Sequence, residues 1–322
     1  MAKINTAALK RGLIAAERNR LKQQTEVRLD PAEHPKLLSI RRAGEKLLEE
    51  SFRQAGVDTK KLGALQKRYS AELRRVVDKQ TADAIRRAPR AKGTVDASIR
   101  GQRDALKLLA ADKPFFPFPL VTLDKPFLIW AAPHSNIISD SSVEPFNSWA
   151  KIRVESSQSS GFEKLSFYFL WDNPSDFYTV INASASLSAI GRLKATAFGG
   201  ASSLYSFHDS SVGCSASFAL WSWWLQPPMA TPYTIQPFAS VLEAASFWDK
   251  SESVSVSQGA NLDKTLFLVP PKGVVVLEVA FQVGYSNSHG RALADFESGG
   301  FRVACPVVVV ALLTSSTAAV VS

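Results

Sequence analysis

The pattern of hydrophobic and polar positions changes near residue 115. Before it, apolar residues recur every three or four positions, which is the period of one face of an α-helix. From Leu120 onward they alternate with polar residues, which is the period of a β-strand. We therefore predict an α-helical region over 1–113, a Pro/Phe-rich hinge over 114–119 and a β-sandwich domain over 120–322.

Several helices are expected in the N-terminal region. The first begins near Thr6, a candidate N-cap, and later ones are separated by Pro31, Pro35 and the cap residue Gly56. The run from Val95 to Leu109 has the apolar spacing of a coiled coil. Because helices with so few apolar side chains seldom persist alone in water, we expect a hairpin or bundle, or packing on the β domain or on other copies of the chain.

The C-terminal region is expected to contain about nine or ten strands. Alternating runs such as SWAKIRVES and KLSFYFLW are separated by turns rich in Gly, Pro, Ser and Asn, without long helical patterns between them. The best helix candidate in this half is short and lies around FASVLEAASFW. The pattern predicts an α+β protein of several parts, in which the helical region is followed by an antiparallel, jelly-roll-like β-sandwich.

Three tryptophans stand close together in FALWSWWLQPP: Trp221, Trp223 and Trp224. In a strand Trp221 and Trp223 share one face and Trp224 lies on the other, so both faces are apolar near the end of this strand. One face can line the core, and the other needs cover from the N-terminal helices, a neighbouring subunit or a ligand. In the last case the three side chains are candidate ligand-binding residues that stack on a glycan.

Charge is divided unevenly between the two regions. Of a total net charge of +9, residues 1–113 carry 27 basic and 14 acidic side chains, whereas 114–322 carry 11 and 15. Paired basic residues along the third expected helix and beyond it are candidate contacts to the phosphates of a nucleic acid. These candidates are Lys67, Arg68, Arg74, Arg75, Arg86 and Arg87. Interspersed acidic residues favour the alternative of a solvated helix surface, and an acidic protein or an anionic membrane surface remains a further alternative.

Catalytic chemistry finds little support in the sequence. The four histidines have no metal-ligand spacing, and GxSxG, GxGxxG and GxxxxGK[ST] do not occur. His208 and Asp209, near Cys214, could form a nucleophile arrangement, but polar loop residues explain them better. The turn WDNPSD could bind calcium, although an Asx-type turn at Asn173 explains the same residues. We predict no enzymatic activity, no cofactor and no metal.

Cys214 and Cys305 are the two cysteines of the chain. They can form one bridge at most, and two buried thiols are the favoured interpretation. The N-terminus has no uninterrupted apolar core of a secretory signal, and VACPVVVVALL is about half as long as a membrane span. We expect no transmembrane segment and a cytoplasmic location by default, with non-classical release or incorporation into a particle as alternatives.

These observations favour a non-enzymatic structural or recognition protein. Strands rich in aliphatic and aromatic residues and poor in titratable groups suit packing and surface recognition, so we predict a self-assembling homo-oligomer whose basic helices dock partners. One alternative is a protein that binds a glycan or a surface receptor, in the manner of a pore-forming toxin. Another is a coat-like protein that binds nucleic acid through residues 1–113.

Overall fold

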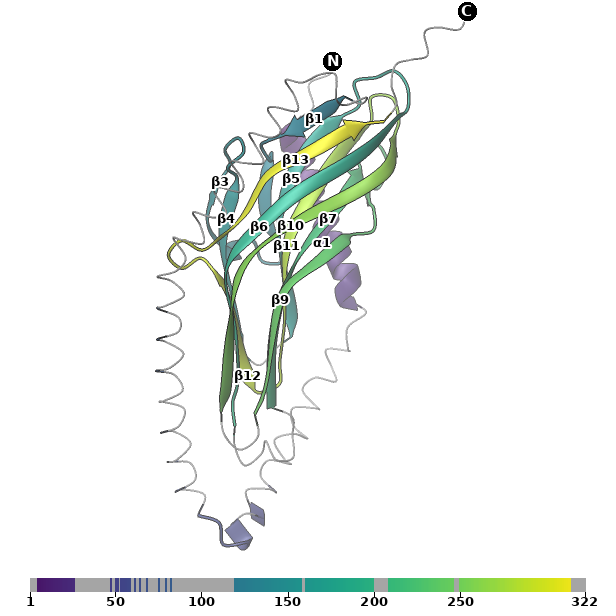
Figure 1. Cartoon of the computed structure of the whole chain (residues 1–322). Coiled ribbons are helices and arrows are strands. Elements are labelled where there is room, and N and C mark those ends of the chain that lie inside the picture. The colour runs from purple at the N-terminus through teal and green to yellow at the C-terminus, as the bar shows by residue number, and fades with distance from the viewer. Residues whose placement is uncertain are drawn as a thin grey trace, which may run out of the picture.

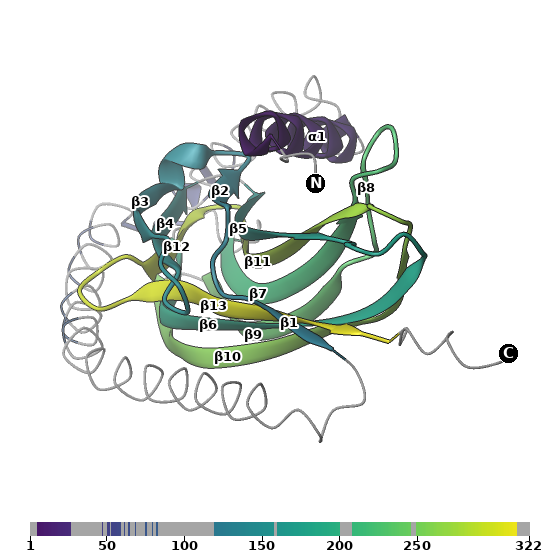
Figure 2. The same ribbon diagram turned by 90° about the horizontal axis from the view of Figure 1, so that it is seen from above.

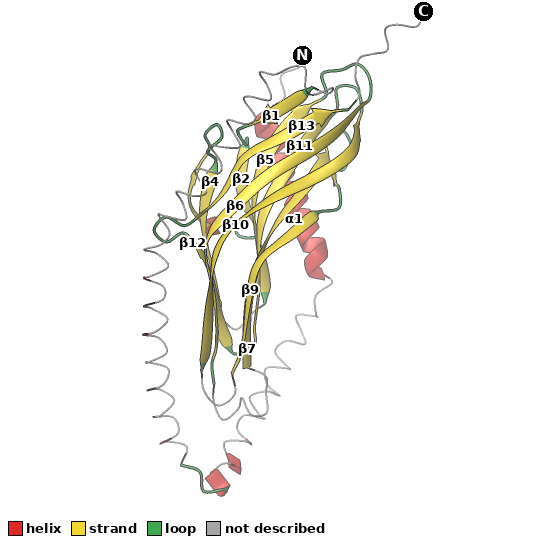
Figure 3. Ribbon diagram, viewed as in Figure 1, coloured by secondary structure: helices red, strands yellow, loops and turns green. Residues whose placement is uncertain are grey.

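The computed structural model describes five long continuous ranges, the short run 53–58 and some scattered positions between residues 47 and 82. The ranges are 5–26, 119–157, 160–199, 208–245 and 249–313. They contain one long helix, α1 (Thr6–Glu26), one short 3-10 helix (Ser135–Ile137) and thirteen strands. The strands form two antiparallel sheets packed face to face, which is the β-sandwich of the predicted α+β fold class (Figure 1; Figure 3).

The larger sheet has seven strands in the order β1-β13-β4-β12-β6-β10, with β3 paired to β4. Two of its strands, β6 and β10, are 19 and 20 residues long and pair along almost their whole length. The strand bounds are β1 (Leu120–Leu123), β3 (Ile138–Ser142), β4 (Trp149–Ser157), β6 (Thr179–Ala197), β10 (Lys250–Val269), β12 (Gly290–Phe296) and β13 (Arg302–Leu312).

The smaller sheet has six strands in the order β2-β5-β11-β7-β8, with β9 paired to β7. The strand bounds are β2 (Leu128–Ala132), β5 (Gly161–Asp172), β7 (His208–Ser222), β8 (Met229–Ala230), β9 (Thr234–Ala245) and β11 (Val274–Asn287). Strand β11 lies at the centre of this sheet, between β5 and β7, and its side chains alternate between the sandwich core and the outer face.

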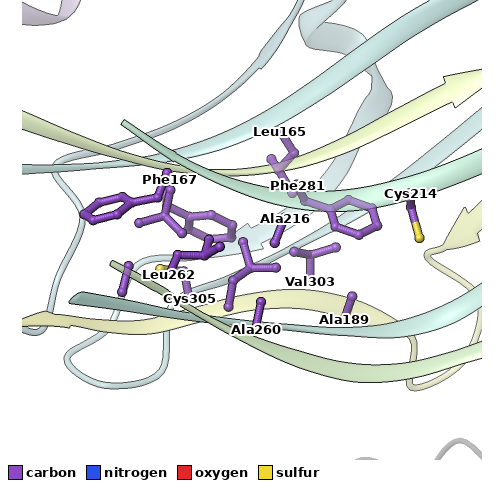
Figure 4. Packing of buried hydrophobic residues seen from close by; sticks show 14 of the residues in the cluster. Leu165, Phe167, Ala189, Cys214, Ala216, Ala260, Leu262, Phe281, Val303 and Cys305 are labelled. Carbon is purple, nitrogen blue, oxygen red and sulfur yellow. The ribbon is translucent and has the colours of Figure 1, made fainter. Parts of the chain in front are cut away.

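The main core lies between the two sheets and combines large side chains with small ones. The six-stranded sheet contributes phenylalanines such as Phe167 and Phe281, whereas β6 of the other sheet contributes alanines such as Ala185 and Ala189. Figure 4 shows Phe167, Phe281 and Ala189 in the space between the sheets. Large residues on one inner face and small ones on the other allow the two sheets to pack closely.

Helix α1 packs on the outer face of the six-stranded sheet, as Figure 2 shows. Its N-cap is Asn5, whose Oδ1 accepts a hydrogen bond from the Ala8 amide at 3.1 Å, so the expected cap Thr6 is instead the first helical residue. Leu9 and Leu13 are buried against the sheet. The cover for this face therefore comes from the N-terminal helical region, one of the three sources considered.

A helical bundle is not supported by the described residues, in which α1 packs on the sandwich. The positions described between 47 and 82 are mostly helical and exposed. The coiled-coil run from Val95 to Leu109 and the hinge at 114–118 lie outside the described residues.

The prediction of a short helix around FASVLEAASFW is wrong, because its residues 238–245 belong to β9 and pair with β7, while 246–248 lie outside the described residues. Its buried residues Phe238, Val241 and Ala245 are three and four positions apart, which imitates a helical period. A bulge in the pairing, between Cys214 and Ser215 of β7, interrupts the two-residue alternation near Phe238. The irregular spacing thus comes from a β-bulge.

The described ranges contain thirteen strands, which is more than the nine or ten predicted from the sequence. The strand β12 was missed because GRALADF is short and lies next to polar turn residues. The separate strands expected at SVSVSQG and KTLFLVPP are parts of the single strand β10, which continues through a bulge between Lys264 and Phe267.

Both cysteines are free and buried, as the favoured interpretation had it. Burial raises the pKa of the Cys214 thiol to about 12 and also raises that of Cys305. Because the thiolate is the reactive form, we expect a thiol-specific reagent at pH 8 to label neither cysteine in the folded protein and both after denaturation. Rapid labelling of the folded protein, followed by mass spectrometry, would contradict this placement.

Candidate functional site on the outer face of the six-stranded sheet

The outer face of the six-stranded sheet is divided into a half covered by α1 and an open half. In the covered half, α1 lies over Trp130, Tyr168, Trp221 and Val276. The open half is a shallow trough over β5, β11, β7 and β9. The residues that line the trough are Phe162, Gly213, Cys214, Ser215, Pro237, Phe238, Ala239, Ser240, Gln282 and Gly284.

Strand register places two glycines at the floor of the trough. Gly284 of β11 pairs with Gly213 of β7 and with Phe162 of β5. A Cβ atom at Gly284 would meet no heavy atom within 4 Å, and one at Gly213 would lie 3.4 Å from the Cβ atom of Ser240. The glycines therefore lower the floor between flanking side chains and leave the backbone accessible to a ligand.

Polar side chains without charge stand beside this floor. The Gln282 amide donates a hydrogen bond to the Ser217 hydroxyl at 2.8 Å, and the Ser215 hydroxyl donates to the Gln282 Oε1 atom at 3.5 Å. These contacts orient the amide on the sheet. On the far side of the glycines, the hydroxyls of Ser160 and Ser286 lie 2.8 Å apart and continue the polar surface.

The covered half contains a cluster of buried charges centred on Glu278 of β11. The Lys164 Nζ atom of β5 donates to Glu278 Oε1 at 2.6 Å and also to the Glu17 carboxylate of α1. The side chains of all three residues are fully buried. Since buried charges are stable only when paired, Lys164 lies between one carboxylate of the sheet and one of the helix.

Four further side chains of the sandwich donate to Glu278. The Ser166 hydroxyl lies 2.7 Å and the Tyr168 hydroxyl 3.3 Å from Oε1, whereas the Trp221 indole nitrogen lies 2.9 Å and the Tyr233 hydroxyl 2.7 Å from Oε2. Both oxygens of the carboxylate are therefore saturated, as is required of a charge without contact to water.

The two carboxyl groups of the cluster have opposite pKa shifts. Burial alone raises the pKa of Glu278, but the Lys164 charge and the hydrogen bonds from Lys164, Tyr233 and Ser166 outweigh it and bring the pKa to about 2. Burial, followed by the charge of Glu278, raises the pKa of Glu17 above its ordinary value. Glu278 is thus the fixed anion of the cluster, and Glu17 is the carboxylate whose ionised form is less stable.

The three tryptophans do not form one exposed platform. Trp221 is 2% exposed beneath α1, and Trp223 packs on the same cluster, where a Cβ atom at Gly12 would lie 3.1 Å from its ring. Trp224 packs on the main core, with its ring 5.9 Å from that of Phe267. The predicted division of the tryptophans between two faces is confirmed, whereas ligand binding by them stays a prediction and requires α1 to move.

The predicted nucleic-acid contacts fall mostly beyond the described part of the chain. Lys67, Arg74, Arg86 and Arg87 lie outside the described residues. Arg68 and Arg75 are described as helical and exposed, which suits either a solvated surface or contact with an anion. Their role stays a prediction.

The other chemical candidates have structural roles. His208 begins β7, is buried, and stacks on His289 with ring centroids 4.3 Å apart. At the turn WDNPSD, the Asn173 side-chain oxygen accepts hydrogen bonds from the Ser175 amide and the Thr179 hydroxyl, each at 3.0 Å, which confirms the Asx-type turn. Among the described residues, no three His, Cys, Asp or Glu side chains gather as a metal site would require, and no helix is long and apolar enough to span a membrane.

The sequence reasoning missed Lys164, Glu278 and the trough. A usable signal existed, because KLSFYFLW begins with a lysine and VVVLEVAF contains a single glutamate within otherwise apolar runs. Charges inside such runs are rarely buried unless they are paired. The trough had no signal of this kind, since strand register alone brings Gly213 and Gly284 together.

No protein-family model matches this chain, and no curated protein matches it. Solved structures similar to it include TmCBM61 in complex with β-1,4-galactotriose, at 9% identity and a TM-score of 0.19 over 61% of this chain and 88% of that one. A structure of carbohydrate-binding modules from the β-sandwich superfamily matches at 9% identity and a TM-score of 0.21, over 61% and 58% of the two chains. The Eiger TNF structure from S. frugiperda matches at 8% identity and a TM-score of 0.20, over 64% and 99%. Likeness at these TM-scores is too weak to indicate a shared ligand or partner.

Proposed function

We propose that the protein is a recognition protein whose trough binds an extended, neutral glycan. The observation that supports this proposal is the open, glycine-floored surface over Gly213 and Gly284, bordered by the hydroxyl and amide groups of Ser215, Ser240 and Gln282. Its lining residues extend over four neighbouring strands, about 14 Å at ~4.8 Å per strand, which suits a chain of several sugar rings better than a compact ligand.

The chemistry of the lining fits sugar hydroxyl groups. Hydroxyl and amide side chains can donate and accept hydrogen bonds at the same time, as sugar hydroxyls do. Phe162 supplies an aromatic ring and Pro237 an aliphatic ring, on which the C–H faces of a sugar can pack. Since no Asp, Glu, Lys or Arg is among the lining residues, a ligand without charge is favoured.

The proposal concerns binding without catalysis. Hydrolysis of a glycosidic bond generally uses two carboxyl groups on either side of the bond, about 5–9 Å apart. The lining side chains of the trough instead provide hydrogen bonds and packing surfaces. An open sheet surface of this kind can hold a polymer along its length.

The test is binding of the full chain to a glycan array, followed by titration calorimetry with the best ligand. The variant Gly284→Leu fills the trough, and we expect it to weaken binding by at least about tenfold, which corresponds to ~1.4 kcal/mol. The matched control is Gly259→Leu, because Gly259 is also an exposed strand glycine, at which an added Cβ atom would come no closer than 3.7 Å to a neighbouring atom, but lies on β10 of the other sheet.

Equal binding by Gly284→Leu and the wild type would refute the trough as the binding site. Failure of the wild type to bind any glycan on the array would contradict the proposal that the ligand is a glycan. Loss of binding in both glycine variants would point to a general effect on the fold, which thermal melting of each variant would reveal.

A further inference from the structure

The polar part of the contact between α1 and the sheet contains two ion pairs, one within the sheet and one within the helix. The sheet contributes Lys164 and Glu278, whose side-chain atoms lie 2.6 Å apart. The helix contributes Glu17 and Arg20, joined by a contact of 2.9 Å between Oε2 and Nε. Each side is therefore neutral by itself, and separating α1 from the sheet leaves neither side with an uncompensated charge.

Glu278 keeps all of its hydrogen-bond donors when α1 is absent. Glu278 accepts hydrogen bonds from Lys164, Ser166, Tyr168, Trp221 and Tyr233, and all five donors belong to the sandwich. Removal of α1 deprives Lys164 of one of its two carboxylate partners and leaves the others in place. The sheet thus holds a preformed surface that lacks one carboxylate.

The apolar part of the contact is separate from the main core. Leu9 and Leu13 of α1 pack in a cluster with Trp130, Trp221 and Val276, and no buried residue of this cluster belongs to the core between the sheets. Among the described residues, no strand pairing involves α1, and the segment 27–119 joins the helix to β1 in the sequence. The helix can therefore leave the sheet without breaking a strand pairing.

We infer that α1 of one copy of the chain can occupy the sheet of another copy, so that exchange of this helix joins copies into an oligomer. A suitable occupant must present a carboxylate to Lys164 and a guanidinium to Tyr233, whose ring lies 5.1 Å from the Arg20 Cζ atom. It must also present two leucines one helical turn apart. A second copy carries this arrangement in its own α1, and exchange of an identical element is a common route to oligomers.

This inference is independent of the proposed glycan site, because the trough lies on the open half of the face and none of its lining residues belongs to α1. Exchange of α1 is a specific mechanism for the self-association predicted from the sequence. In one chain, α1 covers the apolar outer face of its own sheet, and in the oligomer α1 of a second chain covers the same face.

The first test asks whether a separate α1 binds the sheet. The full-length variant Leu13→Asp places a charge in the apolar contact, so its own helix no longer packs and the sheet surface is vacant. A fluorescent peptide of residues 5–26 is expected to bind this variant saturably. The same peptide carrying Leu13→Asp is expected to bind at least about tenfold more weakly, a difference of ~1.4 kcal/mol.

The full-length variant Glu17→Lys repeats this test without altering the leucines, in case Leu13→Asp does not fold. It places a cation beside Lys164 and also releases the helix. Absence of peptide binding to a variant whose sandwich melts as a folded protein would overturn the inference. Equal binding of the native and the Leu13→Asp peptides would overturn it as well, because such binding does not use the α1 contact.

The second test asks whether intact chains exchange the helix. Wild-type protein is labelled in two batches, with a donor or an acceptor dye, and mixed at several concentrations. Exchange predicts a growing energy-transfer signal and a light-scattering mass of more than one chain, and both are expected to be lost in Leu13→Asp. A single-chain mass without energy transfer, at concentrations up to hundreds of micromolar, would overturn the inference.

Discussion

Replacing Glu278 by alanine is expected to lower the free energy of unfolding by about 3–5 kcal/mol, the range for breaking a buried ion pair from one side. The substitution leaves Lys164 buried with only Glu17 of α1 as its partner. It also removes the acceptor for the Tyr233 hydroxyl, which is partly buried, and for the Trp221 indole, which is buried and has no water as a replacement. The loss of several contacts at once makes this the polar substitution with the largest expected effect.

The measurement is urea unfolding followed by circular dichroism, with the wild type as reference. The control is Glu155→Ala, because Glu155 also accepts from two cations, Arg153 and Arg291, but does so at the surface. Surface ion pairs contribute about 0–1 kcal/mol, so this control should change stability by no more than that. Equal effects of the two substitutions would show that Glu278 is not the buried centre of the cluster.

Replacing Phe281 by alanine is expected to cost about 3–5 kcal/mol, the range for removing a fully buried phenylalanine. Its ring is inaccessible to solvent and contacts Phe296 edge to face, with centroids 4.6 Å apart, and Phe238 at 6.1 Å. Phe281 lies on β11, at the centre of the six-stranded sheet, and points at the other sheet (Figure 4). The cavity would open between the sheets, where neither can close it without losing strand pairing.

Thermal and urea unfolding of Phe281→Ala measure this cost. Phe177→Ala is the matched control, since Phe177 is 78% exposed in the turn between β5 and β6 and should change stability by no more than about 0.5 kcal/mol. A small effect at Phe281 together with a large one at Phe177 would contradict the assignment of the core.

The sheet architecture could be predicted because each strand has one face toward the core and the period of two is visible in the sequence. Strand β4 shows it clearly: Ala150, Ile152 and Val154 are buried, and the residues between them are not. The pattern is less clear in β5, where the seven consecutive residues 163–169 are all buried because α1 covers the outer face as well. Its apolar run indicated a strand but not what covers it.

The candidate sites were harder to predict, because they depend on register between distant segments. Lys164 and Glu278 are separated by 114 positions, and Glu17 lies 147 positions from Lys164. Only the pairing of β5 with β11, and the position of α1 on both, brings them together. The trough has the same origin, since no local pattern shows that Gly213 and Gly284 are neighbours across two strands.

The alanines of β6 opposite the phenylalanines of the six-stranded sheet have a consequence for how this sequence can diverge. A larger side chain at Ala185 or Ala189 would have to be matched by a smaller one across the sandwich to keep the same spacing between sheets. Sequences that share this fold should therefore show paired, opposite changes in side-chain volume at these positions, with their sum nearly constant.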